Sequence, residues 1–110
     1  MRQWLAKGPF ATAVICKKDY VAQVLIEVMR EMGLEPGRDL SIIGNGNIEV
    51  RGARAVDKPV LTTIDNPEEA IALRCGESLL MQIQEKFHDI VHEHIPVDLI
   101  SRDTTGPCRR

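Results

Sequence analysis

The apolar positions in the first half of the chain predict a strand, a helix and a second strand. Residues 11–16 are a continuous apolar run with one threonine, typical of a strand buried on both faces of a parallel sheet. A helix is expected over 19–32, with Asp19 as its N-cap and Gly33 ending it. Its inner stripe consists of Val21, Leu25, Val28, Met29 and Met32. With a strand over 40–43, this unit predicts two adjacent parallel strands joined by a right-handed crossover.

The second half of the chain is expected to add two more strands and a long helix. A turn at 45–47 and a polar connection over 49–58 lead to a third short strand over 60–64. A helix is expected over 67–87, because proline suits the first helical position and two glutamates follow it. Its inner face should consist of Ile71, Cys75 or Gly76, Leu79, Ile83 and Phe87. A last strand is expected over 96–101, so the pattern predicts an α/β fold of parallel strands with flanking helices.

Composition and charge narrow the class of protein. The chain has 110 residues, and its net charge of -2 provides no basic face for nucleic acid, so these residues are not expected to touch DNA. No apolar run is long enough to span a membrane or to form a signal peptide. Cys16, Cys75 and Cys108 are far apart and show no metal or redox spacing, which indicates reduced thiols in a cytoplasmic protein.

Five blocks of sequence, in this order, resemble the carboxyl-terminal part of LacI/GalR-family transcription repressors. The segment AVICKKDYVA resembles the family's strand that ends in an Asn-Asp pair before a helix. EMGL and DLSIIG resemble the turn and the second strand, and PVLTTI resembles the segment that crosses between subdomains. IPVDLISRDTT is similar to the closing strand and tail. The resemblance covers almost the whole chain.

The resemblance implies a periplasmic-binding-protein-like fold with two α/β subdomains around a ligand cleft. Residues 1–110 would then be a carboxyl-terminal fragment of an effector-binding domain, without the DNA-binding helix-turn-helix. Residues 11–44 would belong to the carboxyl-terminal subdomain. The helix over 67–87 would belong to the amino-terminal one, with the last strand crossing back.

The implied function is small-molecule effector sensing and dimerisation in a cytoplasmic repressor. The expected partners are a sugar, a sugar phosphate or another small metabolite, and a second copy bound through the helix over 19–32. Operator DNA would be contacted only through the missing amino-terminal domain. The alternative is a fragment of a secreted solute- or sugar-binding protein of the same fold, which a signal peptide in the upstream sequence would reveal.

The first candidate ligand site follows the first strand, because ligands of open α/β sheets bind at the carboxyl ends of strands. Lys18 and Asp19 stand where the family has Asn-Asp, whose asparagine binds sugar hydroxyls. Lysine cannot accept a hydrogen bond, and its charge favours an anionic effector such as a phosphorylated sugar or a carboxylate. The alternative is a solvated lysine beside a helix-capping aspartate.

The second candidate site follows the second strand. Residues 44–47 (GNGN) stand where the family has glycine, an aromatic residue and two aspartates. Gly46 has no side chain to grip a sugar, but Asn45 and Asn47 are candidate ligand contacts; otherwise the segment is a turn. No helix is expected directly after it, so a phosphate loop is not indicated. Asn66 is either a polar residue near the cleft or a helix N-cap.

The sequence contains little that indicates a catalytic or metal-binding site. His88 and His92 have the spacing of zinc ligands on a helix, but His94 falls off that face, and a solvated loop is the favoured interpretation. No cofactor is expected. A small α/β enzyme would need convergent acid, base or nucleophile groups, and only Lys18 and Asp19 are candidates, so we expect a non-enzyme.

Overall fold

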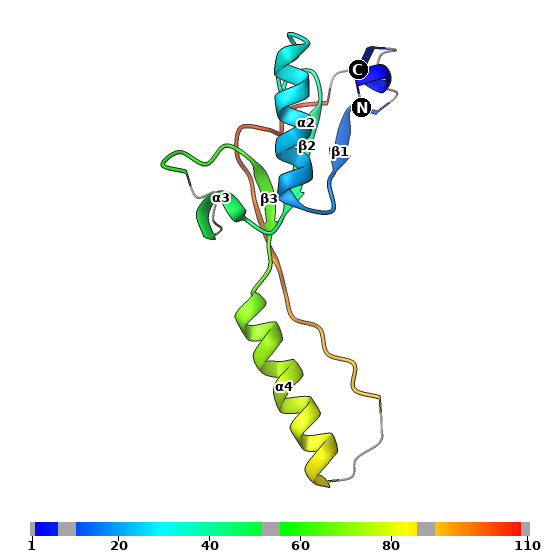
Figure 1. The fold of residues 1–110 in the computed structure, drawn as a ribbon, viewed down its shortest axis with the longest axis vertical. Helices are drawn as coiled ribbons and strands as arrows, with labels where there is room; N and C mark the ends of the chain where they lie inside the picture. The colour runs from blue at the N-terminus through cyan, green and yellow to red at the C-terminus, as the bar shows by residue number, and fades with distance from the viewer. Residues whose placement is uncertain (1, 7–10, 52–55, 86–89, 109–110) are drawn as a thin grey trace. The chain divides into compact units, whose positions relative to one another are not determined.

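Eight helices and strands make up the described part of the chain (Figure 1). The computed structural model describes residues 2–6, 11–51, 56–85 and 90–108. The elements are α1 (Arg2–Ala6), β1 (Ala13–Ile15), α2 (Asp19–Glu31), β2 (Ser41–Asn45), α3 (Ile48–Arg51), β3 (Thr62–Asp65), α4 (Glu68–Glu85) and β4 (Asp98–Ile100). They divide into two compact units, one formed by Met1–Asp65 with Asp98–Arg110 and the other by Asn66–Val97. The chain therefore leaves the first unit after β3 and returns to it at β4.

The first unit is built on one four-stranded sheet with the order β1-β2-β3-β4. β1, β2 and β3 are parallel, with Val14 opposite Ile42 and Gly44 opposite Thr63. β4 runs antiparallel to β3 and places Ile100 opposite Thr63. Helix α2 lies across β1 and β2, as Figure 1 shows. The prediction of two adjacent parallel strands covered by the intervening helix is thus confirmed.

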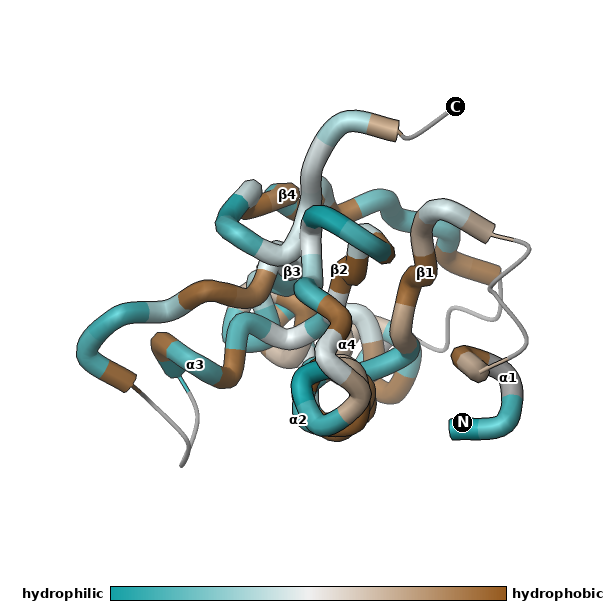
Figure 2. Tube along the Cα trace, turned by 90° about the horizontal axis from the view of Figure 1, so that it is seen from above, coloured by the Kyte–Doolittle hydropathy of each residue, from teal (hydrophilic) through white to brown (hydrophobic). Residues whose placement is uncertain are grey.

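The core of this unit lies between α2 and the sheet. The most deeply buried apolar side chains are Ala22, Leu25, Ile26, Met29, Leu40, Ile42 and Leu61. Figure 2 shows hydrophobic residues along β1 and β2. The predicted stripe is confirmed, because Leu25 and Met29 are buried and the other three members are partly buried against the core. Ile26, which the predicted stripe does not include, is buried as well. Positions 22, 25, 26 and 29 form one face at helical spacing, so Ile26 lies near its middle.

Strand β1 differs from the prediction of burial on both faces. Ala13 is exposed, Val14 is half-buried and Ile15 is 71% exposed. The reason is position, because β1 forms the edge of the sheet and pairs only with β2. An apolar run alone does not distinguish a central strand from an edge strand.

The connection between β2 and β3 contains a short helix that the sequence interpretation missed. Residues 49–58 were expected to form a polar connection, whereas Ile48–Arg51 form α3. Glu49 is buried in this helix, and its Oε2 accepts hydrogen bonds from the backbone N–H groups of Val60 and Leu61, each 2.9 Å long. A buried carboxylate is stable only when it is bonded in this way. The side chain of Glu49 therefore holds the segment just before β3 against α3.

Threonines attach the segment after β4 to the middle of the sheet. The Thr104 Oγ1 donates to the Ile42 carbonyl at 2.8 Å and accepts from the Thr62 N–H at 2.9 Å. The Ile42 N–H donates to the Thr104 carbonyl at 2.7 Å. Gly37 and Gly106 allow a close backbone approach here, because a Cβ on Gly106 would overlap the Gly37 carbonyl oxygen. The tail is thus an integral part of the first unit.

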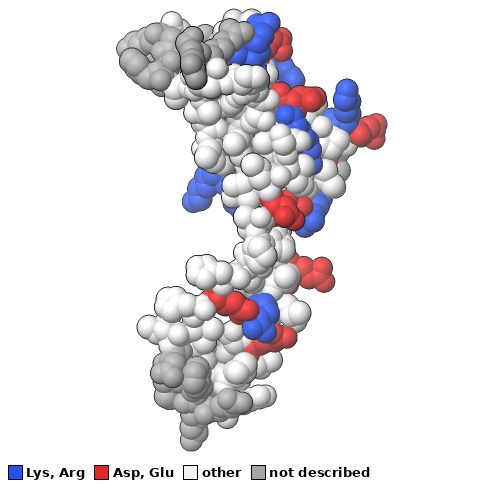
Figure 3. All heavy atoms as spheres, turned by 180° about the vertical axis from the view of Figure 1, so that it is seen from behind, with Lys and Arg blue, Asp and Glu red and all other residues white. Residues whose placement is uncertain are grey.

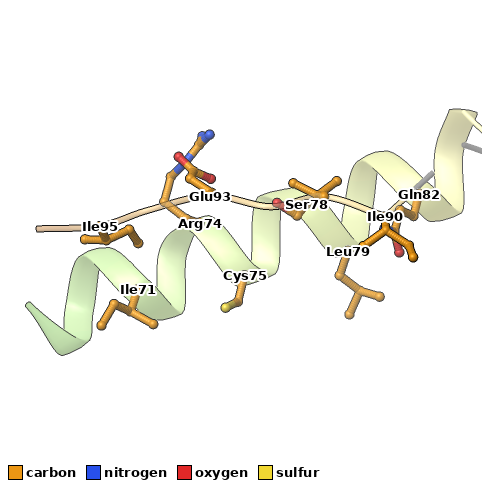
Figure 4. A pocket seen from close by; sticks show the side chains of 10 residues that line it. Ile71, Arg74, Cys75, Ser78, Leu79, Gln82, Ile90, Glu93 and Ile95 are labelled. Carbon is orange, nitrogen blue, oxygen red and sulfur yellow. The ribbon is translucent and has the colours of Figure 1, made fainter. Parts of the chain in front are cut away.

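The second unit consists of α4 and the extended residues 90–97. Between them lies a groove of about 750 Å³ (Figure 4). The groove is lined by Ile71, Arg74, Cys75, Ser78, Leu79, Gln82, Ile90, Val91, Glu93 and Ile95. Arg74 joins its two sides, donating from Nε to Glu93 at 2.9 Å. Of the face predicted to point inward, only Ile71 is half-buried, whereas Leu79 is 57% and Ile83 is 66% exposed. Phe87 lies outside the described residues.

The charged side chains visible in Figure 3 include both signs, and no extended patch of one sign forms among the described residues on this face of the first unit. This mixture of signs agrees with the net charge of -2. Within the ranges that the structure describes, no helix has the length and apolar character needed to cross a membrane.

The three cysteines should differ in reactivity. Cys16 is buried, and burial, followed by the negative charge of Asp19, raises the pKa of its thiol, whereas Cys75 and Cys108 are exposed. At pH 8, we expect a thiol reagent to modify the two exposed cysteines rapidly and Cys16 at least about tenfold more slowly, because the thiolate is the reactive form. Absorbance with a chromogenic disulfide measures the rates. The double variant Cys75→Ser/Cys108→Ser should retain only the slow phase, and a fast phase in that variant would contradict the burial of Cys16.

Candidate functional site

Polar side chains gather where the three parallel strands end. Asp19 follows β1, Asn47 follows β2 and Asp65 is the last residue of β3. The carboxyl ends of parallel strands meet at one edge of a sheet, which is where open α/β sheets bind ligands. Hydrogen bonds and one ion pair connect these residues with three others. We call this set the strand-end cluster; it consists of Asp19, Asn47, Arg51, Thr63, Asp65 and Arg102.

Asp19 is buried at this edge of the sheet. Its side chain is 1% exposed, and its Oδ1 accepts from the Thr63 hydroxyl at 2.7 Å. Its Oδ2 accepts from the Ile48 N–H at 2.9 Å, so it serves the first turn of α3. A Cβ on Gly44 would overlap this carboxylate, which explains why glycine is needed there. Asp19 thus links β1 and α2 to both β3 and α3.

The prediction that Asp19 is the N-cap of its own helix is wrong. The N-cap is Lys18, whose backbone is extended (φ -145°, ψ 151°) and whose side chain makes no capping hydrogen bond. Asp19 is the first helical residue. Its carboxylate turns from its own helix to Ile48 and Thr63, because these distant groups give a buried charge two hydrogen bonds.

Asn47 occupies a left-handed backbone conformation with φ 50° and is 3% exposed. Asparagine tolerates this conformation better than most residues. Its N–H donates to the Thr63 hydroxyl at 3.3 Å. Its side-chain Nδ2 donates to Asp65 Oδ2 at 3.2 Å, and its Oδ1 accepts from Arg102 Nη2 at 2.8 Å. Both ends of the amide are therefore engaged within the protein.

Arg51 and Arg102 bond to the buried polar side chains of the cluster. Arg51 forms an ion pair with Asp65 Oδ2 at 2.9 Å, and its own side chain is 59% exposed. Arg102 also donates from Nη1 to the Leu61 carbonyl at 2.8 Å. Asp65 Oδ1 is buried and has no hydrogen-bond partner among the described residues. Since buried acceptors are nearly always bonded, this oxygen is an unused acceptor of the cluster.

The remaining predicted site residues are less buried. Lys18 is exposed beside Asp19, and Asn45 is half-buried at the end of β2, opposite Ile64. Asn66 is half-buried and belongs to the second unit. Its carbonyl accepts from the Glu68 N–H, whereas the Pro67 carbonyl accepts the bond from Ile71 that opens α4, so Pro67 holds the N-cap position considered for Asn66. The structure brings Asp19 and Asn47 together through Thr63, with Lys18 and Asn45 at the same edge.

Sequence reasoning missed four members of the cluster: Arg51, Thr63, Asp65 and Arg102. Asp65 was visible as the residue that directly follows a predicted strand. Arg102 could be found only from the pairing of β3 with β4, because continuing the register from Thr63–Ile100 sets Arg102 beside Leu61. Arg51 and Thr63 gave no local signal, because their roles depend on partners distant in sequence.

A metal centre has no support within the described ranges, where no three His, Cys, Asp or Glu side chains could hold one ion. His92 and His94 are exposed, and His88 lies outside these ranges. The helix after GNGN corrects another expectation, because α3 follows this segment directly. With four residues, α3 is too short to provide the dipole of a phosphate loop.

Several proteins of known type are similar in sequence to this chain. Residues 1–105 match the family described as periplasmic binding protein-like domain. The HTH-type transcriptional repressor PurR of Vibrio vulnificus is 36% identical over 93 residues, which cover 84% of this chain and 27% of the repressor. PurR of Pectobacterium atrosepticum is 37% identical over 111 residues, covering 99% of this chain and 32% of the repressor. The chain thus spans about a third or less of the length of these relatives.

Solved structures agree with the sequence relatives. A lac repressor dimer bound to operator and the anti-inducer ONPF is 27% identical, with a TM-score of 0.76 over 96% of this chain and 36% of that one. A LacI family regulator from Enterococcus faecium with bound ribose is 30% identical, with a TM-score of 0.73 over 98% of this chain and 40% of that one. The chain therefore belongs to the periplasmic binding protein-like domain family, in the form found in LacI-family transcription repressors.

Proposed function

We propose that the chain is the carboxyl-terminal part of the effector-sensing domain of a LacI-type transcription repressor and binds a small molecule at the ends of β1, β2 and β3. The observation that carries this proposal is the position of Lys18 and Asn45 beside the strand-end cluster, at the edge where open α/β sheets bind ligands. The relatives are repressors, which supports regulation of transcription and a cytoplasmic, non-enzymatic protein.

Regulation would proceed by population shift. An effector that binds one arrangement of the two units better than another changes the equilibrium between them, and a DNA-binding part elsewhere in the protein responds. The helix-turn-helix in the names of the relatives supports DNA contact outside residues 1–110. A secreted solute-binding protein of the same fold is the less favoured alternative. The upstream coding sequence distinguishes the two, by a helix-turn-helix or a signal peptide.

The accessible charge at the strand ends favours an anionic effector. Asp19 and Asn47 bond to the protein itself, so they have little capacity left for sugar hydroxyls. Lys18 and Arg51 are exposed at the same edge, and the charge of Arg51 is balanced by Asp65. Lys18 is therefore the side chain that we propose to contact the charged group of a sugar phosphate or a carboxylate. Asn45 and Asn66 are the other proposed ligand contacts.

Calorimetric titration with D-ribose and D-ribose 5-phosphate tests the site and its charge preference. We expect the phosphorylated sugar to bind more tightly, and Lys18→Gln to weaken its binding about tenfold, because a charge-assisted hydrogen bond is lost. Lys58→Gln is the matched control, an exposed lysine away from the strand ends. Equal affinities in the Lys18→Gln and parent proteins would remove Lys18 from the site, and binding of neither sugar nor any other small metabolite would count against effector sensing.

We also propose that the protein is a dimer that uses α2. The lac repressor neighbour is a dimer, and α2 exposes Tyr20 and Val24, which are 57% and 48% exposed. Ile26, on the same helix, is 4% exposed and belongs to the core. An apolar outer face on a helix that is already packed on its sheet is typical of a contact surface.

Sedimentation velocity tests the assembly. At tens of micromolar, about the range in which weak interfaces associate, we expect a dimer that Val24→Asp converts to a monomer, because burying an unpaired charge is costly. Val50→Asp is the control, since Val50 is 50% exposed on α3. A monomeric parent protein would show that the proposed dimer is wrong, and equal effects of the two variants would move the interface away from α2.

A further inference from the structure

We infer that Asn47 is a positioning residue that couples the loop after β2 to β3 and β4, the two strands through which the first unit connects to the second. The inference rests on the proposed function, because this loop directly follows Asn45, one of the proposed ligand contacts. It adds a path by which a ligand bound beside this loop would change the hydrogen bonds of β3 and β4.

The course of the chain makes β3 and β4 the mechanical link between the units. β3 ends at Asp65, the last residue before the second unit, and β4 begins at Asp98, the first residue after it. The two strands pair antiparallel, with Asp65 opposite Asp98. Within residues 1–110, the covalent path from one unit to the other therefore runs through this pair of strands.

The Asn47 side chain contacts groups from both strands. Its Nδ2 donates to Asp65 at the end of β3, and its Oδ1 accepts from Arg102, two residues after β4. The Arg102 N–H in turn donates to the Thr62 hydroxyl at 2.8 Å, which keeps the arginine at the start of β3. An amide flipped by 180° would place its NH₂ against a guanidinium and its oxygen against a carboxylate, so only one orientation is stable.

The backbone of Asn47 fixes the loop in the same way. The Gly46 N–H donates to the Ile64 carbonyl at 2.9 Å, and the Asn47 N–H donates to the Thr63 hydroxyl. Gly46 and Asn47 both have positive φ, at 124° and 50°, so the loop adopts a conformation that most side chains would resist. A ligand that shifts this loop must strain the hydrogen bonds of Asn47 to Asp65 and to Arg102 together.

Amide hydrogen exchange by NMR on the ligand-free protein tests the coupling. Asn47→Asp keeps the acceptor for Arg102 but sets a carboxylate against Asp65. We expect it to accelerate exchange in the β3–β4 ladder about tenfold, as the loss of one buried hydrogen bond implies, with β1–β2 amides unchanged. Gln84→Glu is the control, the same change from amide to acid at an exposed position of α4, and should leave β3–β4 exchange as in the parent protein.

A double variant distinguishes coupling from a general loss of stability. Asn47→Asp/Asp65→Asn reverses the donor and acceptor of this hydrogen bond and should return exchange to near the parent rate. Arg102→Gln, which leaves the bond between Asn47 and Asp65 in place, should accelerate the same ladder, and it decides the matter if Asn47→Asp fails to fold. Unchanged β3–β4 exchange, or acceleration spread evenly over all strands, overturns the inference. Because no ligand is added, these outcomes are separate from the failure of effector binding.

Discussion

A single buried carboxylate holds the first unit together at the edge where its strands end. A charged group that is 1% exposed is stable only if its oxygens are bonded, and Asp19 meets that requirement with a hydroxyl from β3 and a backbone N–H from α3. Its place against Gly44 also fixes the end of β2. The geometry of the candidate site follows from this constraint. Asp19 lies against Gly44, before the loop that carries Asn47, and bonds Ile48, directly after it.

The other buried polar groups extend the same principle. Glu49 bonds two N–H groups just before β3, and Thr104 bonds Ile42 in β2 and Thr62 at the start of β3. Each of these side chains joins segments that the sheet ladder alone leaves unconnected. A small unit whose apolar core lies on one face of a short sheet thus gains much of its definition from satisfied polar groups, which specify one arrangement more sharply than apolar contacts do.

Local patterns predicted the strands and the longer helices, but neither α3 nor the cluster. The stripe containing Leu25 and Met29 and the strand–helix–strand order depend on spacing within the segment, so the sequence was sufficient for α2 and the parallel pair. The cluster depends on distant partners, since Thr63 lies 44 residues from Asp19 and Arg102 lies 55 residues from Asn47. The same limit explains β1, whose apolar run did not reveal that it would form an edge. Lys18 was correctly placed at the first strand end, whereas the capping role given to Asp19 was not.

The order of the units along the chain has a consequence for synthesis. The second unit, Asn66–Val97, is inserted between β3 and β4, so the outer edge of β3 lacks its partner strand until the ribosome has completed that whole segment. At roughly 5–20 residues per second, the delay amounts to a few seconds. An unpaired strand edge is a template for association with other nascent chains. The Glu49 carboxylate bonds the N–H groups of Val60 and Leu61, just before β3, so the edge left open until β4 arrives is that of Thr63–Asp65.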